Sequence, residues 1–293
     1  MAMGLLDTLA DRLDVFISDL RLWCTLPAFG IMLEMDNHLY PISEWNRALA
    51  YLSGRPCAFS NVPEAKKYLD PKCKEVVVGN PVRESIVYAD RQKAREKLAV
   101  GDKICIVSFG GSQGAHRLNQ AMADLMAWHT KKGSEFEGKI HHIHATGKYG
   151  VEDFPQMLRE KGANFEQNPN VDIREYINDM DDCLAAADLV ICRAGASTLS
   201  ELEAAGRASI LIPSPNVAEN HQYHNGMVLV NNNAAVLIEE KNLTGESLCK
   251  AVEELVSQPQ KLRELGQNAQ KLSMIDANER IYEELMRVYR SKK

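Results

Sequence analysis

Residues 103–118 read KICIVSFGGSQGAHRL and contain three successive patterns: an apolar run, a glycine-rich loop and the start of an amphipathic segment. The run Lys103–Phe109 is apolar and β-branched, as in a buried strand. After a glycine-rich loop, the segment from about 114 to 131 places Leu118, Met122 and Leu125 on one helical face. The sequence therefore predicts a strand, a loop and a helix, which is the first half of a strand–helix–strand crossover.

The loop between this strand and helix reads Phe109-Gly110-Gly111-Ser112-Gln113-Gly114. Glycines allow a backbone to approach a ligand closely, and the N–H groups at the start of a helix favour an anion such as a diphosphate. The hydroxyl group of Ser112 adds a donor. The alternative interpretation is a tight turn that binds nothing, which is equally common for a glycine-rich loop taken alone.

Strand-like runs and amphipathic segments alternate from about residue 75 onward, which predicts an α/β fold with a doubly wound parallel sheet. The expected strands are Glu75–Val78, Lys103–Phe109, Ile140–Ala145, Val171–Tyr176, Asp188–Cys192, Ala208–Pro213 and Ala234–Ile238. The expected helices cover about 114–131, 151–162, 179–186, 197–205, 219–231, 244–257, 259–273 and 276–290. Residues 1–75 are less regular: three strands can be placed there, and Leu13–Ser18 fits either a strand or a helix.

Composition limits the class of protein. The chain has 293 residues, a net charge of −6, and 45% hydrophobic and 25% charged residues. The length suggests two domains, and the composition excludes a mainly disordered chain. The acidic balance argues against nucleic-acid binding through a basic face. No C-x-x-C pair, signal peptide or membrane-spanning segment is visible, so we expect buried cysteines in a reducing compartment.

Two further loops follow expected strands. Residues 193–201 contain Ser197 and Thr198, either of which could cap the next helix, and Glu201, whose carboxylate could accept bonds from two ribose hydroxyls. The alternative is that Glu201 only complements the helix dipole. Residues 213–222 end with Asn220-His221-Gln222, which could recognise sugar hydroxyls or could simply be a solvated helix start.

No metal site is expected. His142 and His144 share a face of their strand, but two histidines without a third ligand are more often packing or surface residues. The G-x-S-x-G, P-loop and H-E-x-x-H motifs are absent, which weakens hydrolase, P-loop NTPase and metalloprotease interpretations.

Taken together, the motifs resemble the MurG family of bacterial glycosyltransferases. They occur in order at Gly79–Arg83, Gly110–Ala115 with Leu118-Asn119, His144–Lys148, Tyr176–Met180, Cys192–Glu201 and Asn220–Gln222. The resemblance implies the two-domain GT-B architecture and inverting, metal-independent transfer of N-acetylglucosamine from UDP-N-acetylglucosamine to lipid I, which forms lipid II for peptidoglycan. It implies no cofactor, and a cytoplasmic enzyme at the inner face of the cell membrane.

The resemblance also implies a donor site in the C-terminal half. Ser112 and neighbouring amides would contact the diphosphate, the backbone of Ile177 would read uracil, and Arg83 would close the site. The turn from Ala196 to Glu201 would hold the nucleotide, with Glu201 on the ribose, and Gln222 with His221 would bind the sugar. The complete expected set is Arg83, Gly111, Ser112, Gln113, Gly114, Ile177, Ala196, Ser197, Thr198, Leu199, Ser200, Glu201, His221 and Gln222.

The departures from the family fall in the N-terminal half, where its Gly-Gly-x-Gly-Gly-His loop and second glycine-rich loop are missing. We therefore expect a truncated acceptor-side domain over 1–80, a donor-binding domain over 84–275, and a last helix over 276–293 that crosses back to the N-terminal part. No catalytic residue is assigned. The alternatives are a non-catalytic or split UDP-N-acetylglucosamine-binding protein, and a GT-B enzyme with another lipid acceptor. Residues 1–45 hold two arginines against seven acidic residues, which counts against docking on an anionic membrane.

Overall fold

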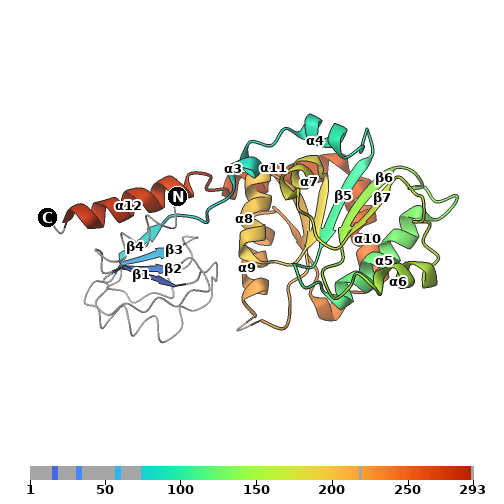
Figure 1. The fold of residues 1–293 in the computed structure, drawn as a ribbon, viewed down its shortest axis with the longest axis horizontal. Helices are drawn as coiled ribbons and strands as arrows, with labels where there is room; N and C mark the ends of the chain where they lie inside the picture. Colours follow the sequence, from blue (N-terminus) through green and yellow to red (C-terminus); the bar gives the residue numbers. More distant parts are fainter. Residues whose placement is uncertain (1–14, 19–30, 35–56, 61–73, 218–219, 292–293) are drawn as a thin grey trace. The chain divides into compact units, whose positions relative to one another are not determined.

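The computed structural model describes residues 15–18, 31–34, 57–60, 74–217 and 220–291 (Figure 1). The chain forms two compact units. Unit 1 comprises Met1–Val82 with Met274–Lys293, and unit 2 comprises Arg83–Ser273. The bounds of unit 2 are close to those of the donor domain expected at 84–275. The roles expected of the domains stay predictions.

Unit 1 contains a parallel four-stranded sheet in the order β1-β2-β3-β4. Its strands are Val15–Ser18, Ile31–Glu34, Cys57–Ser60 and Lys74–Val77. The ambiguous run Leu13–Ser18 is thus a strand at its described end, and its residues 13–14 lie outside the described part. The unit also contains α12 (Ala277–Ser291). Next to it, a Cβ added at Gly79 would lie 2.6 Å from Met274 Cβ, so the chain entering and the chain leaving unit 2 pack closely here.

Unit 2 contains a six-stranded sheet in the order β10-β9-β8-β5-β6-β7, and every neighbouring pair is parallel. The strands are β5 (Ile104–Phe109), β6 (Ile140–Ala145), β7 (Val171–Arg174), β8 (Leu189–Cys192), β9 (Ala208–Leu211) and β10 (Val236–Leu237). The helices are α3 (Glu84–Val87), α4 (Arg91–Lys97), α5 (His116–Thr130), α6 (Phe154–Glu160), α7 (Met180–Ala186), α8 (Ala196–Ala205), α9 (His221–Asn231), α10 (Gly245–Val256) and α11 (Pro259–Leu272), with a 3₁₀ turn η3 at Glu240–Asn242.

Helices cover both faces of this sheet (Figure 1). The apolar stripes of α5, α6 and α10 pack with alternate residues of the central strands, such as Ile106 and Ile191, into one buried cluster. Helices α7 and α8 contact each other and belong to the other layer, and α8 also contacts α11, whose Leu262 and Leu265 belong to the first cluster. The expected doubly wound parallel sheet is therefore confirmed for unit 2.

The expected element boundaries agree with the structure to within a few residues, but α3 and α4 were not expected. Helix α4 buries only Ala94 among its residues, so it has no apolar periodicity that a sequence reading could detect. Its start is set by Asp90, whose side chain accepts a hydrogen bond from Lys93 N at 3.0 Å. A cap of this kind stabilises a helix whose sequence shows no amphipathic pattern.

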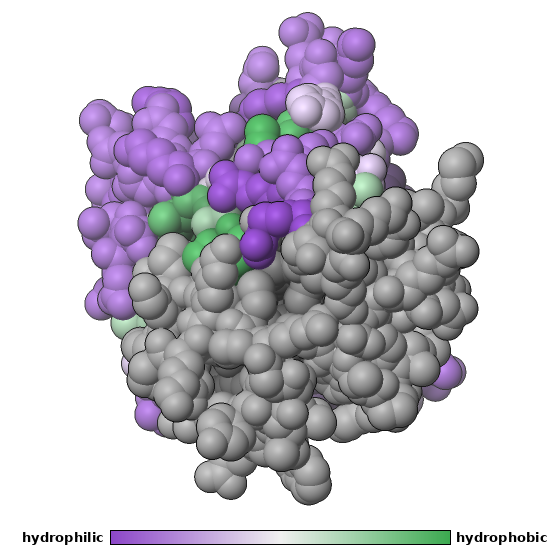
Figure 2. Space-filling model, turned by 90° about the vertical axis from the view of Figure 1, so that its left-hand side faces the viewer, coloured by the Kyte–Doolittle hydropathy of each residue, from purple (hydrophilic) through white to green (hydrophobic). Residues whose placement is uncertain are grey.

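On the face that Figure 2 shows, hydrophilic residues dominate the described part, with a small group of hydrophobic residues among them. None of the described helices is long and apolar enough to span a membrane.

Candidate functional site

The order of the strands in unit 2 reverses between β5 and β8. From β5 the chain continues outward through β6 and β7, and it then returns to β8 and continues through β9 and β10 on the other side. The carboxyl ends of parallel strands at such a reversal diverge and leave a crevice, where α/β proteins bind ligands. The two loops that follow β5 and β8 contain Gly111–Gly114 and Arg193–Gly195, which are two of the three loops singled out in the sequence.

The loop after β5 presents backbone donors. Gly111 and Gly114 have φ angles of +91° and +84°, which residues other than glycine rarely adopt. Gly114 N donates to Gly111 O at 3.0 Å. Helix α5 then begins at His116, and its N-cap Ala115 has no side-chain group that could bond the first turn. Gly111, Ser112 and Gln113 are exposed. Within the described residues, the first N–H groups of α5 therefore receive no side-chain cap and can donate to an anion.

This loop is locked against the loop after β6. A Cβ added at Gly114 would lie 2.3 Å from Thr146 O, and one added at Gly147 would lie 2.1 Å from Gly114 N. Lys148 N donates to Ser112 O at 3.1 Å, and the next amide of the same loop donates to Gln113 O at 3.2 Å. The glycines thus allow two backbones to touch, and this contact holds Ser112 in place.

The loop after β8 corrects one expectation. Helix α8 begins at Ala196, its N-cap is Gly195, and no side chain caps it, so neither Ser197 nor Thr198 forms the expected cap. The reason is that the chain is already helical at Ala196, which puts both hydroxyl residues inside the first turn instead of before it. As a result, α8, like α5, starts at this edge of the sheet, and among the described residues its first-turn N–H groups receive no side-chain cap.

Glu201 lies on α8 and meets Arg83. Arg83 Nη2 lies 3.4 Å from Glu201 Oε1, so two residues expected in one site, but 118 positions apart in the chain, are in contact. Burial raises the pKa of Glu201, and the nearby Arg83 partly offsets that effect. Glu201 is the sixth residue of α8, beyond the first turn in which a carboxylate interacts with the helix dipole, so the dipole does not account for its position.

The remaining expected residues surround these loops. The side chain of Ile177 is buried at 3% exposure, and within the described residues its own N–H and C=O take part in no backbone hydrogen bond. Gln222 Oε1 accepts from Ser214 N at 2.9 Å, which leaves the amide NH₂ as its donor end. His221 is the first residue of α9 and is half-buried. Leu199 is buried and Ser200 half-buried on α8.

A buried polar cluster beneath these loops was missed by sequence reasoning. Ser108 Oγ lies 2.8 Å from both His142 Nε2 and His144 Nδ1, and His129 Nε2 lies 3.2 Å from His142 Nδ1. Burial lowers the pKa of His129 to about 4 and that of His144 to about 3, so these imidazoles are neutral. The sequence shows that His142 and His144 alternate along one strand, but it does not show that His129 of α5 contacts His142, because the two lie in different elements. In the described part of the chain, no group of His, Cys, Asp or Glu side chains is arranged to hold a metal.

Comparisons with known proteins identify the family and the fold. Residues 105–281 match the model of the glycosyltransferase family 28 C-terminal domain. A protein of Desulforamulus reducens, named UDP-N-acetylglucosamine–N-acetylmuramyl-(pentapeptide) pyrophosphoryl-undecaprenol N-acetylglucosamine transferase, is 41% identical over 212 residues, which cover 72% of this chain and 56% of the relative. A relative of the same name from Acetivibrio thermocellus is 40% identical, with 78% and 60% covered. The chain thus spans less than two thirds of the length of these relatives.

Solved structures show the same fold. MurG from Acinetobacter baumannii superposes with a TM-score of 0.65 at 22% identity, covering 88% of this chain and 66% of that one. The MnaA–UDP structure from S. aureus has a TM-score of 0.62 at 12% identity, covering 96% and 80%. These neighbours and the parallel sheet agree with the GT-B fold, and the resemblance seen in the motifs is confirmed. From the family match over 105–281, the chain belongs to glycosyltransferase family 28.

Proposed function

We propose that unit 2 binds UDP-N-acetylglucosamine at the crevice between β5 and β8, and that the protein transfers N-acetylglucosamine to lipid I. The observation that carries this proposal is that α5 and α8 both begin at the strand-order reversal without a side-chain cap. Two helix starts at one edge of the sheet, both without a side-chain cap among the described residues, suit a diphosphate better than a neutral ligand. The D. reducens relative is named for this donor and acceptor, which supports the choice of sugar.

Several of the expected residues then have a task that their surroundings allow. The amides from Gly111 to Gly114, with the hydroxyl of Ser112, bind phosphate oxygens, because this loop is exposed and held by the loop after β6. Glu201 accepts the ribose hydroxyls, and its contact with Arg83 fixes the carboxylate in a partly buried position. The backbone of Ile177 offers one donor and one acceptor to the uracil ring, and the NH₂ group of Gln222 donates to the sugar.

The reaction needs three things from the protein. It must align the acceptor hydroxyl with the anomeric carbon, accept the proton of that hydroxyl, and stabilise the charge that develops on the departing UDP. The first-turn N–H groups of α5 and α8 meet the third need, because they point to where the diphosphate gains charge. The general base and the acceptor contacts stay unassigned, since the acceptor-side domain expected over 1–80 lies mostly outside the described residues.

Calorimetric titration of the full chain with UDP tests the donor site. Glu201→Gln keeps the size of the side chain but removes its charge, so we expect UDP binding to weaken by about tenfold to hundredfold, the worth of bonds to a charged acceptor. Glu246→Gln is the matched control, because Glu246 lies in the first turn of α10, outside the loops and helices proposed for the donor site. Equal affinity for UDP in the wild type and in Glu201→Gln would show that Glu201 does not contact the nucleotide.

A transfer assay tests the reaction. With labelled UDP-N-acetylglucosamine and purified lipid I, the proposal expects a labelled lipid II product. UDP binding without transfer would instead favour the non-catalytic or split protein, particularly where a second chain restored turnover. Transfer to a different lipid but not to lipid I would identify a different acceptor.

A further inference from the structure

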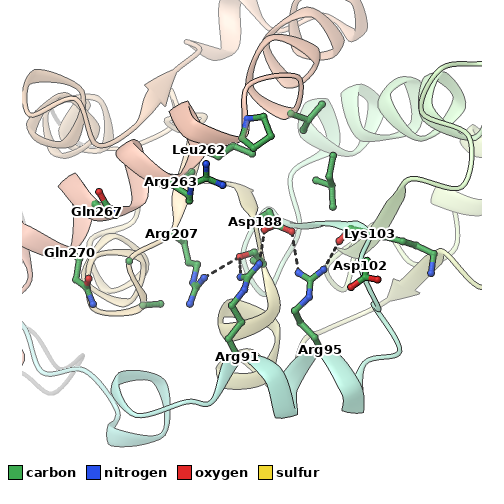
Figure 3. A pocket seen from close by; sticks show the side chains of 17 residues that line it. Arg91, Arg95, Asp102, Lys103, Asp188, Arg207, Leu262, Arg263, Gln267 and Gln270 are labelled. Carbon is green, nitrogen blue, oxygen red and sulfur yellow. Dashed lines mark hydrogen bonds and ion pairs between the residues drawn. The ribbon is translucent and has the colours of Figure 1, made fainter.

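A second pocket lies at the opposite edge of the same sheet. It has a volume of about 510 Å³ and belongs entirely to unit 2 (Figure 3). Lys103, Asp188 and Arg207, which line it, immediately precede β5, β8 and β9, whereas the glycine-rich loops follow the strands. The pocket is therefore separated from the proposed donor crevice by the length of the strands.

Two of its arginines have structural partners. Arg91 donates to Ala187 O at 2.7 Å and to Asp188 Oδ1 at 2.6 Å. Arg95 donates to Ala186 O at 3.0 Å, to Asp188 Oδ2 at 3.1 Å, and to two further carbonyl oxygens. These arginines cap the last carbonyls of α7 and join α4 to the start of β8. Their charges and donors are largely used within the fold.

Arg207 is different. Its only hydrogen bond within the described residues is from Nη1 to Ala187 O at 3.3 Å, and its Nε is buried without an acceptor. The nearby carboxylate of Asp188 already accepts from Arg91, Arg95 and Cys105 N. Burial, together with the charge of Arg91, lowers the pKa of Arg207 to about 10. A half-buried cation that forms no ion pair of its own among the described residues, because Asp188 already pairs with Arg91 and Arg95, is costly, and an anion in the pocket would reduce that cost.

The opposite wall adds donors that face the same cavity. Arg263, Gln267 and Gln270 are spaced by four and three residues on α11, so they lie on one face of that helix. Figure 3 shows Arg207, Arg263 and these two glutamines around one cavity. The lining holds five Lys or Arg side chains against two Asp, in a chain whose net charge is −6. This local excess of positive charge is thus opposite in sign to the protein as a whole.

We propose that this pocket binds a small phosphate-bearing anion. Guanidinium groups offer paired N–H donors that match phosphate oxygens, and the amide NH₂ groups of Gln267 and Gln270 can bind the remaining oxygens. An excess of three positive charges suits a ligand with several negative charges, such as a pyrophosphate or a phosphorylated metabolite, better than chloride. The volume is within the range of pockets that hold small ligands.

The test measures hydrogen exchange on the full-length protein with inorganic pyrophosphate, inorganic phosphate, or chloride at matched ionic strength. Pyrophosphate is expected to slow exchange in α11 and at the start of β9. This readout is separate from the donor crevice, where any binding would protect residues 111–118 instead. Protection by phosphate alone at α11 would show that the pocket takes a single phosphoryl group.

Three variants decide the assignment. Arg207→Gln should weaken pyrophosphate binding about tenfold or more, the loss of a bond to a charged group. Arg263→Gln, on an exposed helix face that folding does not need, should weaken it about two- to fivefold, as for an exposed ion pair. Arg159→Gln is the control, because Arg159 pairs with Glu166 on the surface away from the pocket. No protection of α11 in wild type, equal protection by chloride, or unchanged binding in both pocket variants would overturn the proposal.

Discussion

The contact between the loops after β5 and β6 can be tested by one methyl group. In Gly147→Ala, the new Cβ would lie 2.1 Å from Gly114 N and 2.2 Å from Gly114 Cα. Carbon atoms approach to about 3.5 Å, so the loops must separate by more than about 1 Å. Two backbone hydrogen bonds span this contact, at 3.1 Å and 3.2 Å, and each contributes about 1 kcal/mol. The positive φ of +72° adds about 1 kcal/mol of strain for alanine.

We therefore expect Gly147→Ala to lower the free energy of unfolding by about 3 kcal/mol, the strain and both bonds together. Gly138→Ala is the matched control, because its φ is +71° but a Cβ there meets nothing within 4 Å. It should cost only the strain, about 1 kcal/mol. In thermal unfolding, the two losses correspond to about 6–12 °C and about 2–4 °C for a unit of this size.

Urea unfolding followed by circular dichroism measures both free energies, and hydrogen exchange at Lys148 and Tyr149 reports on the inter-loop bonds directly. Gly147→Ala should also weaken UDP binding, because Ser112 loses its support, whereas Gly138→Ala should not. Equal destabilisation by the two substitutions would refute the reasoning, since it would mean that the loops are not held by backbone contact.

Three further predictions concern stability. Burial lowers the pKa of His129 to about 4 and that of His144 to about 3 in the folded protein. Below about pH 6.5, the unfolded chain therefore binds protons at these histidines that the folded protein does not bind. Each histidine should thus lower the free energy of unfolding by up to about 1.4 kcal/mol per pH unit as the pH falls toward 4. NMR titration of the imidazoles checks this, and titration near pH 6.5 would contradict it. Thr244→Ala should lower the free energy of unfolding by about 1 kcal/mol, because Thr244 and Ser247 form a capping box at the start of α10. An unchanged midpoint in urea unfolding would show that the capping box does not stabilise the protein. Asp188→Asn should cost about 2 kcal/mol by removing the charge from two partly exposed ion pairs with arginines, and an unchanged free energy of unfolding would show that their carbonyl partners suffice.

Sequence reasoning located the loops better than their contacts. The glycine-rich loop at 110–114 and the loop at 193–201 both follow strands and open helices, as expected. The expected cap at Ser197 or Thr198 was wrong, because the exact start of a helix depends on backbone angles that residue type alone does not set. The contact between Arg83 and Glu201 could be suggested only by resemblance, since 118 residues separate them.

What the sequence determined by itself was the alternation of strands and helices, and with it the parallel sheet. Hydrophobic periodicity is local, and crossover connections permit few other arrangements. Only the tertiary structure decided which strands became neighbours, and so placed the uncapped starts of α5 and α8 at one crevice. It also decided that Asp188 pairs with two arginines, while Arg207 forms no ion pair among the described residues. Charge balance at a buried site depends on distances between residues far apart in the chain, and those distances exist only once the chain has folded.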